Sequence, residues 1–549
     1  MTDGRSNLNN LNNLNDLNNR VILAADLGTS GCKCALVGLD GVVLRWAFRP
    51  VALHIVDQVG AEQAPEDWWS AFIEAAREVI AALPQRGKEI VAVCCSSQGE
   101  CTVPVDKSGQ PLHRAMLWMD MRGAEAIRRR AGNRMVSVAG YDPLKLLRWI
   151  HRSGGAPALS GKDPAGHIAF IQEAWPDIYD RTHKFLNALD YMNLRLTGRF
   201  AATADSILTA WVTDNRDPNN IRYDRGLAAQ SGIDLEKLPE IVPCAEVLGT
   251  LCSAASEELG LPRQTPVVAG AVDNSAAAIG SGTVRDGEAH LYIGTSSWIQ
   301  AHVPFKKTDV TAQIASVPCA ISGRYLAVAM QSSAGSNISF LLDNILCHPD
   351  EFAHRKPADA YAVLDRIAAS VPEGARGLLY TPWIFGERSP VDDSSLRAGL
   401  LNISLRHSRA DMIRAFLEGV ALNTRWMMTP FNRFLGKPLD RITMIGGGAT
   451  SHVWCQIFAD TLGIPVRQLS APIQANAVGA ALIGYVGIGA LSFDDVPELV
   501  HIAETYMPNP GRTAVYDELF AHFKFAHKRL APLYRRMNRH MNYRGSTQS

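Results

Sequence analysis

One short motif, Gly-Thr-Ser, occurs twice in this chain at distant positions, each time directly after an apolar run. Glycine permits a tight turn there, and the residues after it can donate backbone N–H groups and hydroxyls to phosphate oxygens. A second strand-like segment follows each copy at once. The pair therefore predicts a duplicated α/β fold that holds one nucleotide from both sides. The residues of the two copies are Gly28, Thr29, Ser30, Gly294, Thr295 and Ser296.

Length and charge limit the alternatives. A chain of 549 residues exceeds one ordinary hydrophobic core, so we expect more than one domain. The balance of 54 Lys and Arg against 54 Asp and Glu argues against nucleic acid or an anionic membrane as the main partner. No apolar run approaches the ~20 residues that span a bilayer. We expect a disordered low-complexity tail over residues 1–20, an N-terminal domain over 21–282 and a C-terminal domain over 283–549.

The ten cysteines are scattered and form no Cys-x-x-Cys pair. Adjacent Cys94 and Cys95 lie in an apolar strand, where neighbouring side chains point to opposite faces. Buried free thiols and a reducing cytoplasm are therefore expected.

Strand-like and helix-like segments alternate along the chain, which is typical of an α/β architecture. Helices are expected to begin near Pro65 and Ser408 and to end the chain over residues 516–534. Residues 150–166 are rich in loop formers and predict an excursion from the core. The expected strands are residues 21–25, 34–38, 42–47, 90–95, 266–270 and 441–445.

Two aspartates, Asp26 and Asp273, each follow or end a predicted strand, where open α/β sheets place ligands. The sequence contains no Gly-x4-Gly-Lys-Ser/Thr motif and no zinc-binding pattern. Taken alone, Asp273 is more typical of a helix cap, because an aspartate at a helix start accepts backbone N–H groups.

The order of these motifs resembles the FGGY carbohydrate kinases, and within that family the xylulokinases. The resemblance implies the sugar-kinase/Hsp70/actin fold, with two actin-like (ribonuclease H-like) ATPase domains. It runs from residue 21 to the final helix. The segments that carry it are 26–30, 118–122, 189–191, 194–198, 270–274, 293–296, 386–390, 399–401, 414–419, 446–449 and 476–481.

The resemblance makes Asp273 the general base on the sugar hydroxyl, a role that suits a carboxylate at a strand end. It also assigns Asp26, with Asp273, to Mg²⁺, held in part through water. Lys33 lies where the family often has a basic residue near the phosphates, although a solvated strand lysine is the alternative. The residues implied in ATP binding are Asp26, Gly28, Thr29, Ser30, Lys33, Gly294, Thr295, Ser296, Gly447, Gly448, Ala449 and His452.

The sugar side is implied to include Gln98, Gly99, Glu100, Trp118, Asp273 and Asn274. Glu100 stands where many xylulokinases have histidine, and it either accepts sugar hydroxyls or is an exposed loop acid. Trp118 either stacks on the carbon skeleton or belongs to the core.

Four further residues carry expectations of their own. Glu387 and Arg388 are expected to form an internal ion pair near the site instead of contacting a ligand. Asn402 replaces a glycine usual in the family, and His452 replaces a smaller polar residue.

The expected activity is ATP-dependent phosphorylation of a primary hydroxyl of a ketopentose, D-xylulose, in a cytoplasmic enzyme that uses ATP and Mg²⁺. Kinases for glycerol, erythritol or ribulose are the enzyme alternatives. A catalytically silent sugar sensor of the same fold is the other alternative. The sequence leaves the oligomeric state open, a homodimer included.

Overall fold

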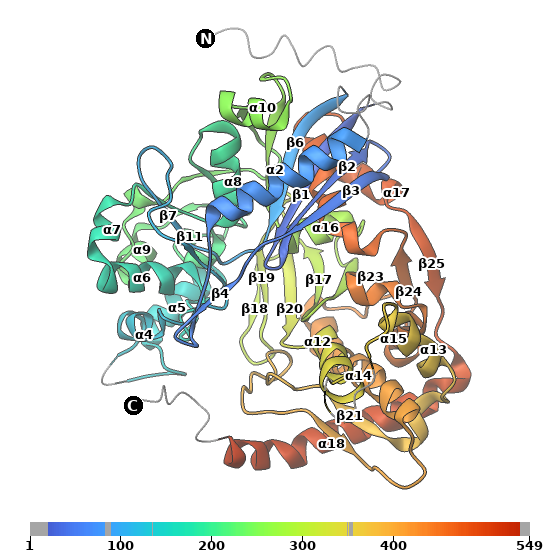
Figure 1. Cartoon of the computed structure of the whole chain (residues 1–549). Helices are drawn as coiled ribbons and strands as arrows, with labels where there is room; N and C mark the ends of the chain where they lie inside the picture. The colour runs from blue at the N-terminus through green and yellow to red at the C-terminus, as the bar shows by residue number, and fades with distance from the viewer. Residues whose placement is uncertain (1–19, 83–88, 134–135, 349, 351–354, 539–549) are drawn as a thin grey trace.

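Two mixed β-sheets, one from each half of the chain, organise the structure (Figure 1). The computed structural model describes residues 20–82, 89–133, 136–348, 350 and 355–538. The first sheet has the order β14 (Val247–Thr250), β15 (Pro266–Val272), β6 (Ile90–Ser97), β1 (Val21–Gly28), β2 (Gly31–Gly38) and β3 (Val43–Pro50). The second has the order β18 (Thr308–Asp309), β19 (Ile314–Pro318), β20 (Tyr325–Gln331), β17 (Ser297–Val303), β16 (Ala289–Ile293), β23 (Ile442–Ile445), β24 (Val466–Leu469) and β25 (Ile502–Tyr506).

The two sheets repeat one local pattern. In the first, β1 pairs antiparallel with β2 through the Gly28 turn and parallel with β6. In the second, β16 pairs antiparallel with β17 through the Gly294 turn and parallel with β23. The predicted duplication, with one Gly-Thr-Ser hairpin in each half, is therefore confirmed.

Smaller elements surround the sheets and fall outside them. The strands are β4 (His54–Val56), β5 (Gly60–Gln63), β7 (Val103–Val105), β8 (Ala115–Met116), β9 (Lys184–Leu186), β10 (Ala201–Thr203), β11 (Thr213–Asp214), β12 (Arg222–Tyr223), β13 (Glu240–Val242), β21 (Leu379–Thr381) and β22 (Gly399–Leu401). The helices are α4 (Ala124–Ala131), α5 (Pro143–Arg152), α6 (Pro164–Ala174), α7 (Pro176–Arg181), α8 (Ala188–Thr197), α9 (Arg225–Ser231), α10 (Ser253–Leu259), α12 (Gly335–Phe340), α13 (Ala360–Ala369) and α17 (Val496–Leu499).

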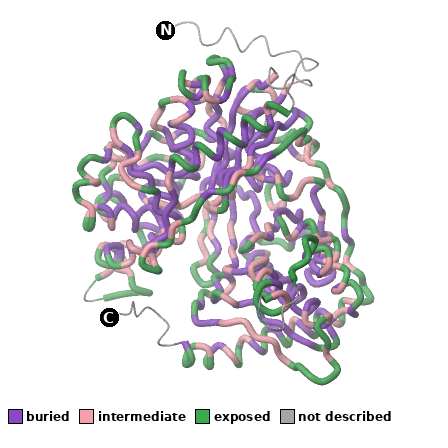
Figure 2. The backbone as a smooth tube through the Cα atoms, viewed as in Figure 1, coloured by how far each residue is buried: buried purple, intermediate pink, exposed green. Residues whose placement is uncertain are grey.

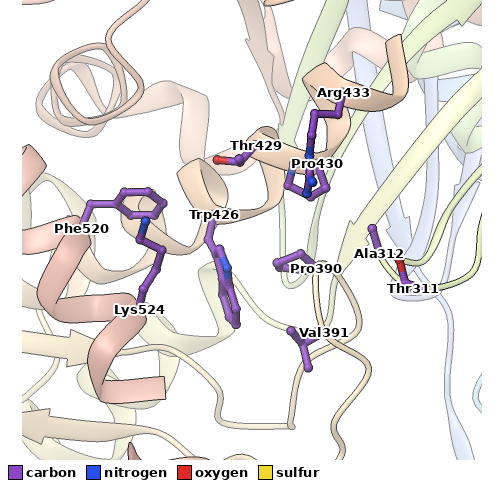
Figure 3. Close-up of a pocket in the computed structure, with 10 residues that line it drawn as sticks. All are labelled: Thr311, Ala312, Pro390, Val391, Trp426, Thr429, Pro430, Arg433, Phe520 and Lys524. Atoms are coloured by element: carbon purple, nitrogen blue, oxygen red, sulfur yellow. The ribbon is translucent and has the colours of Figure 1, made fainter. Parts of the chain in front are cut away.

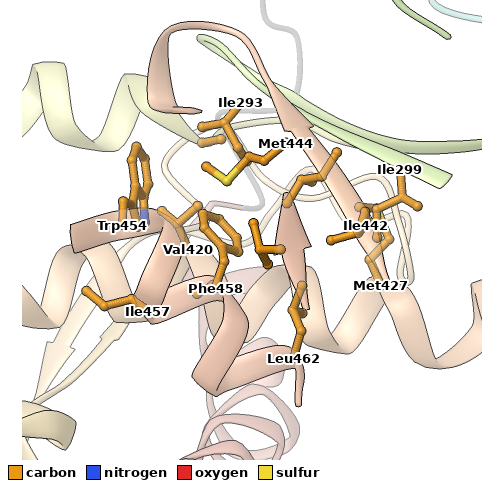
Figure 4. Close-up of a cluster of buried hydrophobic side chains, with 14 of the residues drawn as sticks. Ile293, Ile299, Val420, Met427, Ile442, Met444, Trp454, Ile457, Phe458 and Leu462 are labelled. Atoms are coloured by element: carbon orange, nitrogen blue, oxygen red, sulfur yellow. The ribbon is translucent and has the colours of Figure 1, made fainter. Parts of the chain in front are cut away.

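Helices cover the sheets as their apolar faces dictate. Helix α2 (Pro65–Ala82) begins at the predicted proline and buries Trp68 and Phe72 against the first sheet. Helices α14 (Arg409–Leu435) and α15 (His452–Leu462) pack on the second sheet, where Figure 4 shows Phe458 and Met444 in one cluster. The buried backbone in Figure 2 follows the same two sheets. The final helix, α18 (Thr513–Met537), packs against α14, as expected from its apolar stripe.

Two helices pack against each other where the two halves of the chain meet. Helix α11 (Asp273–Gly280) packs against α16 (Ala475–Gly487), and α16 also covers β1, β6 and β15 of the first sheet. Thus a helix from the second half completes the core of the first. The division between residues 282 and 283 stays a prediction.

The predicted loop over residues 150–166 is wrong at both ends. Helix α5 continues to Arg152, and α6 begins at Pro164, so the connection covers residues 153–163. Proline suits the first turn of a helix, and the Asp163 carboxylate caps α6 by accepting the backbone N–H of Gly166. The proline and glycine that predicted a loop therefore mark a helix start.

The ten cysteines are free thiols, and eight of them are buried. Cys94 and Cys95 lie in different core clusters on the two sides of the sheet, as expected. Within the described part of the chain, no helix combines the length and apolar character needed to cross a membrane. The predicted tail over residues 1–20 lies outside the described residues except for Arg20.

Candidate active site

Asp26 is buried near the end of β1, two residues before Gly28 of the first Gly-Thr-Ser hairpin. Lys33 on β2 is its register partner, and the lysine Nζ lies 3.2 Å from Asp26 Oδ2. Asn476 from α16 donates its Nδ2 to Asp26 Oδ1 at 3.3 Å. The second half of the chain therefore contacts the first aspartate directly, and Lys33 is an ion-pair partner instead of a lysine held by water alone.

Asp273 is the first residue of α11, directly after β15. Its Oδ1 accepts the backbone N–H of the adjacent Asn274 at 2.7 Å, and the residue at the N-cap is Val272. Burial and the nearby charge of Asp26 raise the pKa of Asp273 to about 7. A carboxylate with a pKa near neutrality has the proton affinity that a general base needs.

The second hairpin lies close to the same two aspartates. Tyr292, two residues before Gly294, has its pKa raised by burial and by the charges of Asp26 and Asp273. Gln300 on β17 donates its Nε2 to Asn274 Oδ1 at 2.6 Å. The chain thus brings both predicted turns, both aspartates and Asn274 into one region.

Several backbone groups of the second turn already form hydrogen bonds within the protein. The Gly294 N–H donates to Ser296 O at 3.0 Å, and the Gly294 and Thr295 carbonyls accept from Gly335 and Ala334 at the start of α12. Thr295 is exposed. Among the predicted phosphate ligands of this turn, Thr295 and Ser296 are therefore better placed than the Gly294 amide.

The triple glycine packs against the second turn. Gly446 has a φ of 86°, and a Cβ on Gly448 would lie 2.3 Å from Ile293 Cγ2. Glycine is required for this approach. Ala449 is buried and its carbonyl accepts from Gln468, whereas Gly447 is exposed.

His452, at the start of α15, lies beside the triple glycine with an exposed ring. Its Nδ1 is hydrogen-bonded to the Tyr506 hydroxyl and lies 3.4 Å from Glu504 Oε2. The histidine that departs from the family pattern therefore has partners on β25, which the sequence did not indicate.

A hydrogen-bonded chain joins the first turn to the loop after β6. Thr29 Oγ1 donates to Gln98 Oε1 at 2.6 Å and accepts from Trp118 Nε1 at 3.0 Å. Gln98 Nε2 donates to Gln63 Oε1 at 3.0 Å, and Gln63 also accepts from Trp68. Gln98 is buried, so these contacts orient Thr29 and Trp118 and leave little of its amide for a ligand.

The sugar-side residues differ in exposure. The Trp118 residue is 41% exposed, so the alternative of a core tryptophan is wrong. Gly99 and Glu100 are partly exposed, and Glu100 has a φ of 59°. Burial raises the pKa of Glu100, while the charges of Arg388 and Lys162 lower it.

The expected Glu387–Arg388 ion pair is wrong. Glu387 is buried, and its carboxylate accepts the backbone N–H groups of Ser332 and Arg388 and the Asn423 amide. The Arg388 side chain is exposed and points away from it toward Met330. Asn402 has a φ of 68°, which asparagine tolerates better than most residues, so it serves where the family has glycine.

The sequence did not indicate several residues that contact or support the two site aspartates. Asp205 Oδ2 accepts the Val272 N–H at 3.2 Å directly before Asp273, and Asn476 reaches Asp26 from α16. Asn476 does lie in a family segment, and that was the one available signal. Lys162, whose charge lowers the pKa of Glu100, lies in none of the family segments, whereas Arg388 lies in segment 386–390 and was expected only as the ion-pair partner of Glu387.

One pocket lies elsewhere, between α14, α18 and the loop at Pro390 (Figure 3). Its volume is about 270 Å³, and Trp426, Arg433, Phe520 and Lys524 line it. None of the predicted site residues contributes to this pocket.

The donor set near Asp26 suits a hard cation. The carboxylates of Asp26 and Asp273 are both oxygen ligands, and they lie close enough for the charge of Asp26 to help raise the pKa of Asp273. The described residues hold no cluster of three or more His, Cys, Asp or Glu side chains arranged for a metal ion. The two carboxylates match Mg²⁺, which keeps much of its water and takes only one or two carboxylates beside substrate phosphates.

Two family models match the chain in succession. The model for the N-terminal domain of the FGGY family of carbohydrate kinases matches residues 21–280, and the model for the C-terminal domain matches residues 289–488.

Individual relatives agree with these matches. The xylulose kinase of Bacillus subtilis is 28% identical over 521 residues, covering 92% of this chain and 96% of its own. The gluconokinase of that organism is 25% identical over 494 residues, covering 89% and 91%. The crystal structure of the xylulose kinase from Rhodospirillum rubrum superposes with a TM-score of 0.79 at 27% identity, covering 94% of this chain and all of that one.

The duplicated hairpins, the paired aspartates and the two successive family matches have one explanation. The chain has the two-domain fold of sugar kinases, and it belongs to the FGGY family of carbohydrate kinases.

Proposed function

We propose that this kinase transfers the γ-phosphoryl group of ATP to a primary hydroxyl of a ketopentose, D-xylulose, giving D-xylulose 5-phosphate. The observation that carries the proposal is Asp273, a helix-start carboxylate of raised pKa that lies near Asp26 and the second Gly-Thr-Ser turn. Relatives named xylulose kinase support the choice of sugar.

ATP lies between the two hairpins in this proposal, with Gly28–Ser30 and Thr295–Ser296 around its phosphates and residues 447–449 beside the adenosine. Lys33 neutralises part of the phosphate charge or orients Asp26, to which it is already paired. Asp26, with Asp273, would hold Mg²⁺ in part through water, and the bound ion would offset the negative charge of the phosphates.

In the chemical step the sugar hydroxyl oxygen forms a bond to the γ-phosphorus while the bond from that phosphorus to the ADP oxygen breaks. Asp273 takes the hydroxyl proton as the alcohol attacks. Asn274, fixed by Gln300, contacts a neighbouring hydroxyl. Closure of the two halves excludes water, which would otherwise accept the phosphoryl group.

A coupled assay of ADP release across D-xylulose, D-ribulose, glycerol and erythritol tests this function. The proposal expects D-xylulose to have the highest kcat/KM. Highest activity with another polyol would retain the kinase function and replace the substrate, and no activity with any of them would favour a silent sensor.

The free cysteines support the cytoplasmic location expected from the sequence.

We expect Glu100→Gln to raise the KM for sugar about 10- to 100-fold, because a hydrogen bond to a charged group contributes roughly 1.5–3 kcal/mol. The KM for ATP should change little. Steady-state kinetics with each substrate varied in turn measures both. An unchanged sugar KM would remove Glu100 from the sugar site.

We expect Thr295→Val to weaken ATP binding or slow turnover, because its hydroxyl is exposed beside the second turn. Thr29→Val should do the same and also raise the sugar KM, since it breaks the hydrogen bonds to Gln98 and Trp118. Steady-state kinetics of both variants tests whether both Gly-Thr-Ser turns bind the phosphates of one ATP. Normal ATP parameters in either one would mean that its turn is structural only.

A further inference from the structure

The pocket between α14, α18 and the loop at Pro390 lies apart from the proposed active site (Figure 3). Its volume is about 270 Å³, and six of its ten lining residues are apolar. A cavity of about 150 Å³ is already large enough to hold benzene. The pocket therefore has room for one ring together with an acidic group.

Trp426 of α14 forms one wall of this pocket, and Figure 3 shows it between α18 and the loop at Pro390. Its ring meets Phe523 in a T-shaped contact and His527 at a tilt of 55°, and among the described residues no ring stacks flat on it. Its indole N–H donates to no acceptor in the described part of the chain and is not one of its fully buried polar atoms. The indole is thus available for a planar ring.

Two exposed cations, Arg433 of α14 and Lys524 of α18, line the same pocket. Within the described ranges, neither side chain forms a hydrogen bond or an ion pair, and Lys524 Nζ lies 4.6 Å from the centre of the Phe520 ring. Arg425 lies over the same ring but is paired with Asp517. Because an ammonium and a guanidinium are donors only, two unpaired ones at one pocket favour an anion.

Asp309 on β18 is the acid that responds to Arg433. Hydrogen bonds from the Thr311 hydroxyl and from backbone N–H groups lower its pKa, and the charge of Arg433 adds to this effect. Its Oδ1 accepts the N–H groups of Thr311 and Ala312 and the Thr311 hydroxyl, so this oxygen shapes the turn beside the pocket. Arg433 therefore keeps its donors for a ligand.

The uncharged polar side chains of the pocket are already used within the protein. Thr311 Oγ1 donates to Asp309 Oδ1 at 2.7 Å, and Thr429 Oγ1 donates to the Arg425 carbonyl at 3.2 Å. A sugar carries several hydroxyls, and each of them needs a partner when it is buried. A ring without hydroxyls that bears one acidic group therefore suits this mainly apolar lining better than a sugar.

We propose that this pocket is an effector site for a small aromatic acid, a single ring that bears a carboxylate or a phosphate. The ring lies against Trp426, and Arg433 and Lys524 bind the acidic group. Binding at this pocket is independent of the proposed kinase function.

Hydrogen bonds connect the pocket wall to the second Gly-Thr-Ser turn. Asn423 precedes Trp426 by three residues on α14, and its backbone carbonyl accepts Gln331 Nε2 at 2.8 Å. Gln331 Oε1 in turn accepts the Ser297 hydroxyl at 3.0 Å, and Ser297 directly follows the turn. A ligand that repositions this part of α14 therefore acts on the strand that begins at the turn.

The loop at Pro390 is tied to the same elements. Ser389 Oγ donates to the Ala312 carbonyl beside the pocket at 2.8 Å. Buried Glu387 accepts the Ser332 N–H at 3.0 Å and the Asn423 side-chain amide. Occupancy of the pocket thus changes nucleotide binding at the second turn, and this coupling alone rests on the proposed ATP site.

Calorimetry with phenyl phosphate, benzoate, phenol and inorganic phosphate tests the site, with and without saturating ADP and Mg²⁺. We expect at least one of the two acids to bind at least tenfold more tightly than phenol and inorganic phosphate. Arg433→Gln and Lys524→Met should each weaken that acid about 10- to 100-fold. Lys528→Met, at an exposed lysine of α18 outside the pocket, is the matched control and should leave its Kd unchanged.

Absence of saturable binding by both acids would overturn the site, and so would equal affinity for phenol. An unchanged Kd in both pocket variants would also overturn it, since the acid would then bind elsewhere.

The Kd of ADP with and without the bound acid measures the coupling, which we expect to be about fivefold or more. Ser297→Ala should remove this difference and leave the Kd of the acid unchanged. Equal ADP affinities in the wild type would overturn the effector role. Acid binding that depends on Arg433 and Lys524, in a protein that phosphorylates no sugar, would retain the site and overturn the proposed function alone.

Discussion

Replacing Asp273 by asparagine is expected to lower kcat about 10²–10⁴-fold, the usual contribution of a general base. Asparagine keeps the shape of the side chain and an oxygen that can accept the Asn274 N–H, which Asp273 accepts at 2.7 Å. It removes the proton acceptor and one negative charge beside Asp26. Steady-state kinetics measures the loss, and calorimetry should still detect nucleotide and sugar.

Asp190→Asn is the matched control. Asp190 also lies in the first turn of a helix, and burial also raises its pKa to about 7, but its carboxylate serves the capping box of α8. Its replacement should change stability more than kcat. If Asp273→Asn turned over sugar at a near wild-type rate, the carboxylate would be a structural group at the helix start, and another base would be required.

Gly479→Ala is expected to have the second largest effect, on stability. A Cβ on Gly479 of α16 would lie 1.9 Å from the Ala276 carbonyl oxygen of α11, and one on Gly280 would lie 1.8 Å from the Ala475 oxygen. The atoms that would collide are backbone, so a rotamer change gives no relief. We expect a loss of about 3 kcal/mol or more, at or above the upper end for overpacked cores.

A lower denaturant midpoint of unfolding reports this loss of stability. Midpoints are compared directly, without conversion to free energies, because a chain of two domains need not unfold in one step. Gly447→Ala is the control for stability, since a Cβ there would have no heavy atom within 4 Å. Equal midpoints for Gly479→Ala and the wild type would mean that the two helices can separate at little cost. The close crossing would then not hold the halves together.

Local patterns in the sequence predicted the parts of the site that are local. The two hairpins follow from a glycine after an apolar strand, and their duplication follows from the repeated motif. Asp26 and Asp273 could be placed together because the carboxyl ends of parallel strands share an edge of a sheet. The helix starts at Pro65 and Ser408 follow from capping residues.

Contacts between distant segments could not be predicted in this way. Asn476 reaches Asp26 because α16 crosses to the first sheet, and no periodicity in α16 records which sheet it covers. Asp205 supports the strand end before Asp273 from a separate loop. Arg388 was paired with Glu387 because they are adjacent, but the buried acid is satisfied by backbone N–H groups and Asn423. Such pairings depend on the assembled fold.

The most direct test of the central claim is the product formed from ATP, Mg²⁺ and D-xylulose, measured by phosphorus NMR with ADP quantified in the same sample. The account predicts one D-xylulose 5-phosphate for each ADP, with both lost in Asp273→Asn. ADP formed with inorganic phosphate and without sugar phosphate would contradict it, and so would sugar phosphate formed at an unchanged rate by that variant.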